Sequence, residues 1–252
     1  MQLSPTIVVP CYNEAERLDV ESFRAWSDAH PRVRLLFVDD GSTDATADVL
    51  GRLADADHRD ALILPQNGGK AEAVRRGILH ALDRGDPGPF GFWDADLATS
   101  LELIPAFATV MAERPEIEIV MGARVKLLGR DIRRNTARHY FGRAAAFLVS
   151  NMLRLPVYDT QCGAKLFRKT APIEELFREP FVTRWAFDVE LLARWIGAHP
   201  ERTRADLEAY VVEFPLPAWR DVAGSKLQPT DFMRTPMDLA RIASTYRKEL
   251  GS

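Results

Sequence analysis

The sequence has few cysteines, almost no net charge and no long hydrophobic run. Cys11 and Cys162 are too few for a disulfide framework or a structural zinc site, which favours a reducing, cytoplasmic compartment. With 33 basic and 36 acidic side chains, the net charge of −3 gives no support to a nucleic-acid binder. Uncharged runs such as 1–13 and 144–153 fall short of the roughly 20 residues that span a bilayer. The first residues also lack the pattern of a signal peptide, so we expect a chain that does not cross a membrane.

The first half alternates short apolar runs with amphipathic stretches. The runs that we interpret as strands are 6–10, 34–38, 61–64, 89–93 and 117–121. Helical spacing of apolar residues predicts helices over 14–29, 43–54, 69–82 and 101–114. This alternation predicts an α/β fold, with a mostly parallel sheet and helices on both faces.

The second half is less regular. We predict helices over 131–155, 185–198 and 231–250, and strands near 164–168 and 210–214. The sequence contains no repeat, no low-complexity tract and no clear linker. We therefore expect one domain over residues 1–252, in which the second half completes a site that the first half opens.

Polar residues follow each predicted strand of the first half. These segments are PCYNE at 10–14, DDGSTD at 39–44, NGGK at 67–70, DAD at 94–96 and GAR at 122–124. The carboxyl ends of parallel strands meet at one edge of a sheet, so these segments are expected to share one site. Turn formation explains the glycines and asparagines, but not so many carboxylates beside a lysine and an arginine. For Asp44 a turn or capping role is expected, because a helix begins there.

Asp94 and Asp96 are the candidate metal ligands. Two carboxylates on a turn suit a hard divalent cation such as Mg²⁺ or Mn²⁺, which prefers oxygen ligands and can bridge two phosphates. A D-x-D triplet alone is weak evidence, and its position directly after a strand strengthens it. Ser100 and Glu102 are available to begin the next helix, so the two aspartates are not needed as caps.

Four motifs carry a family resemblance. TIVVPCYNEAERL, FVDDGSTDAT, NGGKAEAVRRGI and FWDADLAT resemble, in order and spacing, the signatures of inverting family 2 glycosyltransferases, which have the Rossmann-like GT-A fold. Later segments (GAR, DTQCGAKLF, RWAFDVELL and GSKL) are similar to polyprenyl-phosphate sugar transferases, most of all dolichyl-phosphate glucosyltransferases. The matches extend from residue 6 to 227. They imply a nucleotide-sugar-binding half, 1–122, and an acceptor-binding half, 123–252.

The resemblance also implies roles for single residues. The implied donor-binding residues are Pro10, Tyr12, Asn13, Glu14, Asp39, Asp40, Lys70, Asp94, Asp96, Arg124 and Lys226. Asp40 would bind the edge of the base, and Asp96 would hold the metal that bridges the diphosphate. Arg124 and Lys226 would supply positive charge near the phosphates.

Two aspartates compete for a catalytic role near the sugar. The resemblance favours Asp159, which opens DTQCGAKLF, as the acid closest to the reacting centre. Asp188 is the second candidate, although it lies in a predicted amphipathic helix and could instead pair with an arginine. Cys162 is expected to be a packing residue, because the sequence suggests no nucleophilic partner.

Residues 121–155 hold eight basic side chains and one acidic side chain. A basic amphipathic helix in this stretch could lie on an anionic bilayer or hold a lipid phosphate. The alternative is an ordinary helix with one buried and one solvated face. The residues that we assign to acceptor binding are Arg133, Arg134, Arg138 and Lys165.

These observations favour transfer of a hexose to a polyprenyl phosphate with inversion. UDP-glucose is the expected donor, ahead of GDP-mannose, and glucose is the expected sugar. The same donor chemistry on a soluble hydroxyl acceptor is the first alternative. A sugar-1-phosphate nucleotidylyltransferase is less consistent, because PCYNEAERL stands where such enzymes usually carry a glycine-rich loop. The intact DAD triplet argues against a non-catalytic nucleotide-binding module. The protein would be cytoplasmic, with possible peripheral contact to the membrane.

Overall fold

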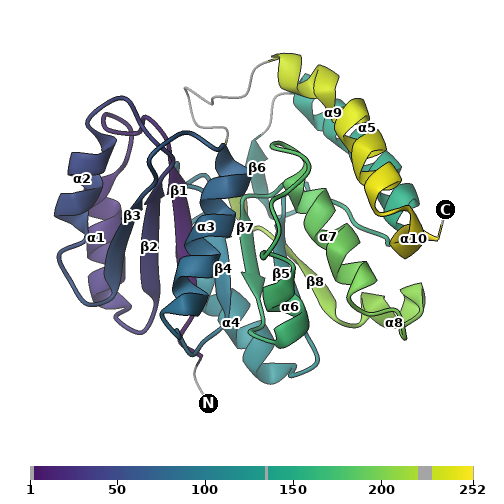
Figure 1. The fold of residues 1–252 in the computed structure, drawn as a ribbon, viewed down its shortest axis with the longest axis horizontal. Helices are drawn as coiled ribbons and strands as arrows, with labels where there is room; N and C mark the ends of the chain where they lie inside the picture. The colour runs from purple at the N-terminus through teal and green to yellow at the C-terminus, as the bar shows by residue number, and fades with distance from the viewer. Residues whose placement is uncertain (1–2, 134–135, 221–228, 252) are drawn as a thin grey trace.

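A computed structural model describes residues 3–133, 136–220 and 229–251. Its main sheet has seven strands in the order β3-β2-β1-β4-β7-β5-β8 (Figure 1). Their bounds are β1 Thr6–Cys11, β2 Arg34–Asp39, β3 Arg59–Ile63, β4 Phe90–Trp93, β5 Ile119–Ala123, β7 Ala164–Phe167 and β8 Val211–Pro215. Only β7 runs antiparallel to its neighbours in this sheet, β4 and β5. The predicted α/β class is confirmed, and the first five predicted strands are all present with ends shifted by one or two residues.

Helices cover both faces of the sheet. They are α1 Val20–Ala29, α2 Thr46–Leu53, α3 Lys70–Asp83, α4 Leu103–Glu113, α5 Thr136–Leu153, α6 Ala171–Glu175, α7 Phe187–Gly197, α8 Arg204–Glu208, α9 Pro229–Thr245 and α10 Arg247–Leu250. Successive strand side chains point to opposite faces, so Val8 packs in the core beneath α3 and α7, while Ile7 packs in the core beneath α1 and α4. Gly77 lets α3 lie close to the sheet, because a Cβ there would be 2.7 Å from Val8. Among the described residues, no helix combines the length and the apolar character needed to cross a bilayer.

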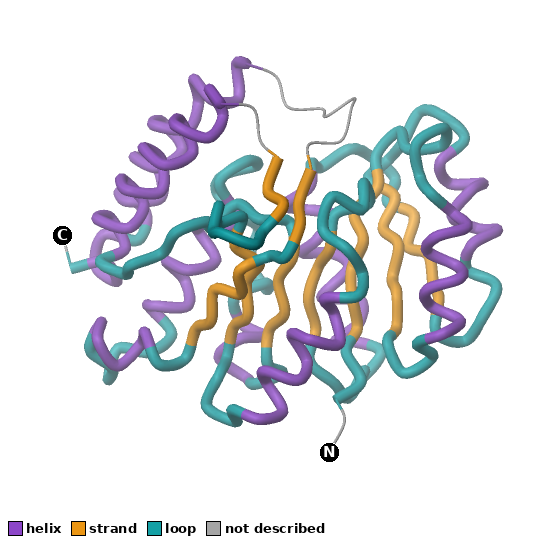
Figure 2. Tube along the Cα trace, turned by 180° about the vertical axis from the view of Figure 1, so that it is seen from behind, coloured by secondary structure: helices purple, strands orange, loops and turns teal. Residues whose placement is uncertain are grey.

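A second, two-stranded sheet joins β6 Asp131–Arg133 to β9 Ala218–Arg220 in parallel. Figure 2 shows it beside the main sheet, near the end where α5 and α9 run side by side. The helix predicted over 131–155 is therefore wrong at its start, because 131–133 form a strand and α5 begins at Thr136. Pairing with a distant segment decides this stretch, since the Asp131 backbone N–H donates to the carbonyl of Pro217 at 3.0 Å.

Two other helix predictions need correction. The helix predicted over 14–29 begins at Val20, where Asp19 caps it by accepting the Ser22 N–H at 3.0 Å. The preceding residues are thereby left to form a loop at the carboxyl edge of the sheet. The helix predicted over 231–250 is divided into α9 and α10, and 210–214 is not the last strand because β9 follows it.

Candidate active site

The carboxyl ends of β1, β2, β3, β4 and β5 lie at the same edge of the sheet, as the sequence predicted. Asp94 also connects this edge to the loop before β7, because its backbone N–H donates to the carbonyl of Gly163 at 2.9 Å. The strand pairing therefore brings segments from both halves of the chain to one rim.

Asp39 is the last residue of β2 and Asp40 follows it, and both are almost fully buried. Asp39 accepts hydrogen bonds from the backbone N–H and the hydroxyl of Ser42. Asp40 accepts from the Asn67 side-chain amide at 2.9 Å and from the backbone N–H groups of Gly68 and Gly69 at 2.8 and 2.7 Å. Burial raises the pKa of Asp40, and the two backbone bonds oppose that rise. Asp40 thus ties the loop after β2 to the loop before α3, and its contact with a base stays a prediction.

The loop after β1 packs against the loop after β2. Pro10 and Tyr12 are partly buried at the end of β1. Asn13 has a positive φ of 49°, and its side-chain oxygen accepts the Thr43 N–H at 2.9 Å. The Glu14 N–H donates to the Thr46 hydroxyl at 2.7 Å. These bonds bring two segments that carry the implied donor-binding residues into contact.

Asp44 stabilises the turn before α2. Its carboxylate accepts the backbone N–H of Thr46, the first residue of that helix, at 2.9 Å. This local bond agrees with the turn role expected from the sequence.

The candidate metal ligands follow β4. The Asp94 carboxylate lies 2.5 Å from the Lys70 ammonium, and a Cβ at Gly163 would lie 1.7 Å from an Asp94 oxygen. Asp96 accepts the Ala98 N–H at 3.0 Å. Burial and then the negative charge of Asp94 raise the pKa of Asp96. A divalent cation would relieve this repulsion, so the residues fit a metal.

Two carboxylates do not fill the ligand shell of such a metal. Among the described residues, no cluster of three or more histidines, cysteines, aspartates or glutamates could hold one. This donor set suits Mg²⁺ or Mn²⁺ that takes its other ligands from phosphate oxygens and water. Burial alone would lower the pKa of Lys70, but the charges of Asp94 and Asp188 outweigh it and raise that pKa.

Asp188, the second catalytic candidate, pairs with Lys165 at 2.6 Å. Both side chains are buried, and the Lys165 ammonium also donates to the carbonyl of Cys162 at 2.7 Å. The partner of Asp188 is therefore a lysine rather than the arginine considered from the sequence. Lys165, assigned to acceptor binding, is 1% exposed and holds the loop before β7 against the start of α7.

Asp159 binds Arg124 in a fork. The Arg124 Nε and Nη2 atoms donate to the two carboxylate oxygens at 2.6 and 2.7 Å, and the Arg124 backbone N–H donates to one of them at 2.9 Å. Burial alone would lower the pKa of Arg124, but Asp159 outweighs it and raises that pKa well above its usual range. Asp159 therefore fixes the direction of the guanidinium, which also lies over the ring of Trp219.

The prediction missed Glu213, which supports this pair from β8. Its carboxylate accepts the backbone N–H of Asp159 at 2.7 Å and that of Tyr158. Burial raises the pKa of Glu213, and these backbone bonds oppose the rise. A carboxylate inside the otherwise apolar strand VVEFP was the available signal.

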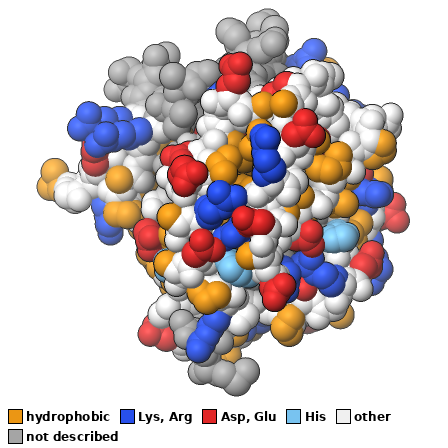
Figure 3. Space-filling model, turned by 90° about the vertical axis from the view of Figure 1, so that its left-hand side faces the viewer, with side chains coloured by type: hydrophobic (Ala, Val, Ile, Leu, Met, Phe, Trp, Pro, Cys, Tyr) orange, Lys and Arg blue, Asp and Glu red, His pale blue; other side chains and the backbone are white. Residues whose placement is uncertain are grey.

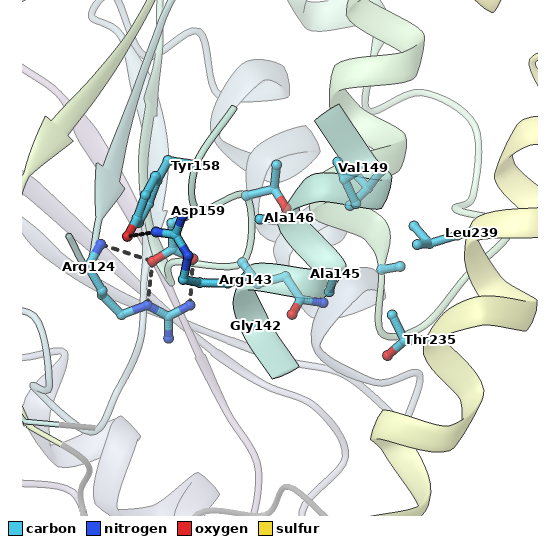
Figure 4. A pocket seen from close by; sticks show the side chains of 14 residues that line it. Arg124, Gly142, Arg143, Ala145, Ala146, Val149, Tyr158, Asp159, Thr235 and Leu239 are labelled. Carbon is cyan, nitrogen blue, oxygen red and sulfur yellow. Dashed lines mark hydrogen bonds and ion pairs between the residues drawn. The ribbon is translucent and has the colours of Figure 1, made fainter. Parts of the chain in front are cut away.

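A pocket that is open to solvent adjoins the Arg124–Asp159 pair (Figure 4). Arg143 from α5 also lines it and donates to the Tyr158 hydroxyl at 2.6 Å. The apolar lining comes from three helices and includes Ala145, Ala146, Val149, Val189 and Leu239. The pocket thus combines a cationic region with small apolar walls, which suits an amphiphilic molecule bearing an anionic group.

The remaining assigned residues are placed differently. Arg134 and Lys226 lie outside the described residues, and the side chain of Arg138 is also outside the description. Arg133 belongs to β6 rather than to a helix, and its exposed side chain pairs with Asp131 at 2.8 Å.

The prediction also gave no role to Arg184, at the start of RWAFDVELL. It donates to the side-chain oxygen of Asn67 at 2.9 Å, and a Cβ at Gly69 would lie 2.8 Å from its Nε atom. Arg184 therefore links the second half of the chain to the loop that Asp40 holds.

Sequence comparisons identify relatives of this chain. The family model described as "Glycosyl transferase family 2" matches residues 6–175. Dolichyl-phosphate beta-glucosyltransferase of Trichomonas vaginalis is 31% identical, with 97% of this chain and 72% of that protein covered. The human protein of this name is 32% identical over 90% of this chain and 71% of its own length. The Saccharomyces cerevisiae protein is 30% identical over 96% and 74%.

Solved structures support the fold. Mannosyl-3-phosphoglycerate synthase from Rubrobacter xylanophilus gives a TM-score of 0.68 at 17% identity, covering 99% of this chain and 75% of that one. Glucosyl-3-phosphoglycerate synthase from Mycobacterium tuberculosis, in complex with Mn²⁺ and UDP-glucose, gives 0.63 at 19% identity, with 99% and 79% covered. The fold is GT-A, and this chain is an enzyme that belongs to glycosyl transferase family 2.

Proposed function

We propose that the enzyme transfers glucose from UDP-glucose to a polyprenyl phosphate, with inversion and with the help of a divalent cation. The observation that carries the proposal is that the candidate metal ligands, Asp94 and Asp96, and the pocket beside Arg124 lie close together at one rim of the sheet. The Asp94 backbone N–H donates to the carbonyl of Gly163 at 2.9 Å, two residues after Gln161, which lines the pocket together with Arg124. The dolichyl-phosphate beta-glucosyltransferases to which the chain is similar support glucose and a lipid phosphate as the two substrates.

On the donor side, Asp94 and Asp96 would hold the cation. When bound, the cation would neutralise charge that develops on the leaving diphosphate. Lys70 keeps a second positive charge against Asp94, directly at the start of α3. Asp40, through Gly68 and Gly69, fixes the loop that leads to Lys70.

On the acceptor side, Arg124 and Arg143 supply the charges that a phosphate requires. A phosphomonoester has a second pKa near 6, so it is mostly ionised at pH 7 and attacks without a general base. Asp159 suits this chemistry, because its oxygens are engaged by Arg124 and it orients that cation. The small apolar walls of the pocket would then receive the first part of the lipid chain.

We also propose that the reaction takes place in the cytoplasm, at the membrane face. The chain has only two cysteines, both of them buried, which supports a reducing compartment.

The test is a substrate matrix. The protein is incubated with UDP-glucose or GDP-mannose, with Mn²⁺, Mg²⁺ or chelator, and with a short-chain polyprenyl phosphate or the corresponding alcohol. The expected product is a β-linked glucosyl phosphodiester that forms only with UDP-glucose, the cation and the phosphate. Glucosylation of the alcohol but not of the phosphate would overturn the acceptor assignment and favour a hydroxyl acceptor. Transfer at a full rate in chelator would overturn the metal assignment.

A further inference from the structure

The segment that joins β5 to β6 carries two adjacent exposed leucines. Leu128 is fully exposed and Leu127 is 49% exposed. The carbonyl of Leu127 accepts the Arg130 N–H at 3.1 Å, and Gly129 between them has a φ of 80°. This is the pattern of a type II turn, with Leu128 at its first central position. A Cβ at Gly129 would meet nothing within 4 Å, so an ordered turn presents its apolar tip to open space.

Cations surround this tip. Lys126 and Arg130 flank the leucines and are exposed. Arg133 on β6 and Arg220 on β9 are also exposed and share the single carboxylate of Asp131. The result is an apolar point with an excess of positive charge around it. The face over α1, α2 and β3 is different, because acidic and basic side chains are interspersed there (Figure 3).

The tip is attached directly to the reaction site. Arg124, whose backbone N–H is bonded to Asp159, begins the segment that carries the leucines. Leu128 is four residues along the chain from Arg124, which allows a span of at most about 14 Å between their Cα atoms. A surface that binds the tip therefore lies close to Arg124 and its pocket.

We propose that residues 126–130 dock the enzyme on an anionic lipid bilayer. Leu127 and Leu128 enter the boundary between headgroups and acyl chains, while Lys126 and Arg130 contact lipid phosphates. Charge complementarity selects this occupant, because a purely apolar partner would leave the surrounding cations unmatched. The inference extends the proposed function, since docking presents the pocket to an acceptor held in the membrane, but docking itself requires no catalysis.

Cosedimentation with vesicles tests the proposal on the whole protein. Vesicles of phosphatidylcholine with phosphatidylglycerol are compared with vesicles of phosphatidylcholine alone. At low salt the protein is expected to bind the anionic vesicles, and salt is expected to release it. Leu127→Ser with Leu128→Ser should lower the partition coefficient by about tenfold or more, from the apolar area that no longer inserts. Ile63→Ser is the matched control, because Ile63 is similarly exposed, at 48%, on the edge strand β3 at the far side of the sheet.

A second measurement reports insertion directly. Cys11 and Cys162 are buried, so a polarity-sensitive dye should label Leu128→Cys selectively. Its emission is expected to shift to the blue with anionic vesicles and to stay unchanged with an Ile63→Cys label. Absence of the shift, or equal vesicle binding by the double serine variant and the wild type, would overturn the proposal.

Docking and transfer can fail separately. Glucose transfer to a short-chain polyprenyl phosphate in detergent tests the proposed function without a membrane, and the double serine variant should retain it. Vesicle binding without any transfer would remove the proposed function and leave docking in place. A dimer that the leucine substitutions dissociate, with no vesicle binding, would assign the tip to a second copy of this chain and overturn the membrane proposal.

Discussion

The two halves of the rim hold their carboxylates by different means. In the first half, the buried Asp39 and Asp40 accept hydrogen bonds from neutral hydroxyl, amide and backbone groups. In the second half, Asp159 and Asp188 are paired with Arg124 and Lys165. Neutral donors position a loop without cancelling the charge of a carboxylate. Ion pairs instead fix the direction of a cation, which suits an anionic acceptor. The first half also holds one ion pair, between Lys70 and Asp94 of the carboxylate pair that fits a metal.

Lys70 connects the two arrangements. Its ammonium contacts Asp94 of the first half, and the charge of Asp188 from the second half also raises its pKa. Removing the charge of Asp94 or of Asp188 should therefore change the pKa of Lys70. The comparison predicts that substitutions in the first half act mainly on donor binding, whereas those in the second act on stability or on the acceptor.

The largest effect is expected for Asp96→Ala. Loss of a metal ligand should lower turnover by at least about 10²–10³-fold, because the leaving diphosphate loses its main counter-charge. Calorimetric titration of Mn²⁺ in the presence of UDP should show the corresponding loss of metal binding. The melting temperature should change little, because this carboxylate lies at the rim. Near-normal transfer by this variant in chelator would contradict the assignment.

Breaking the buried pair of the second half should mainly affect folding. Lys165→Met leaves the Asp188 carboxylate buried without its cation, so the free energy of unfolding should fall by about 3–5 kcal/mol. Urea unfolding measures it, and Lys165→Met with Asp188→Leu should recover much of the loss. Ser42→Ala, which removes a neutral donor from Asp39, should cost only about 1–3 kcal/mol. Equal costs would remove the distinction between the two halves.

Asp40→Asn tests whether hydrogen bonds from neutral groups to Asp40 shape the nucleotide-sugar site. The new amide cannot accept from Asn67, Gly68 and Gly69 together, so UDP affinity should weaken by roughly 1–3 kcal/mol. Calorimetry with UDP and GDP measures the loss and shows which base the site prefers. Unchanged affinity for both nucleotides would mean that neither the base contact nor this loop depends on the carboxylate.

Gly163→Ala should weaken metal binding although it replaces no metal ligand, and it is the exception to this comparison because Gly163 lies in the second half. The new Cβ would overlap the Asp94 carboxylate, while the φ of Gly163 is not positive and permits alanine. A loss of Mn²⁺ affinity of roughly tenfold is expected if Asp94 must turn by about 30° away from a rotamer, which costs about 0.5–1.5 kcal/mol. Gly51→Ala in α2 is the matched control, because its Cβ would meet nothing within 4 Å and should leave metal affinity unchanged. Equal Mn²⁺ affinity in both variants would show that metal binding does not depend on the position of the Asp94 carboxylate against Gly163.

Local sequence pattern predicted most of the sheet and the polar rim. Periodicity encodes which face of an element is buried, and strand ends locate the loops at one edge. It does not encode which distant segment a short strand joins, so β6 was assigned to a helix until β9 supplied its partner. For the same reason, the antiparallel placement of β7 between β4 and β5 was not predicted.

The ion pairs of the site were harder to foresee than its carboxylates. The family resemblance indicated Asp159, with Asp188 as the second candidate, but their partners depend on how β5 and β7 lie against the loops and helix that follow. Glu213 and Arg184 act on backbone or side-chain groups far away in sequence, so the local pattern could mark the residues but not their partners. Residue type thus indicated the chemistry, and only tertiary structure showed which charges remain available to a substrate.

The smallest effect is expected for Asp159→Asn, which should leave the acidic edge of the pH profile of turnover where it is. If a phosphate is the nucleophile, turnover should fall below about pH 6 as the acceptor takes up a proton. The variant should lower the plateau, because Arg124 loses the carboxylate that directs it, but the acidic edge should stay at the same pH. Turnover with a short-chain polyprenyl phosphate measured from acidic to neutral pH gives both quantities. If the acidic edge disappears in the variant, Asp159 is itself the titrating base. A hydroxyl acceptor, which requires such a base for about 10²–10⁴ of its rate, then becomes the better assignment.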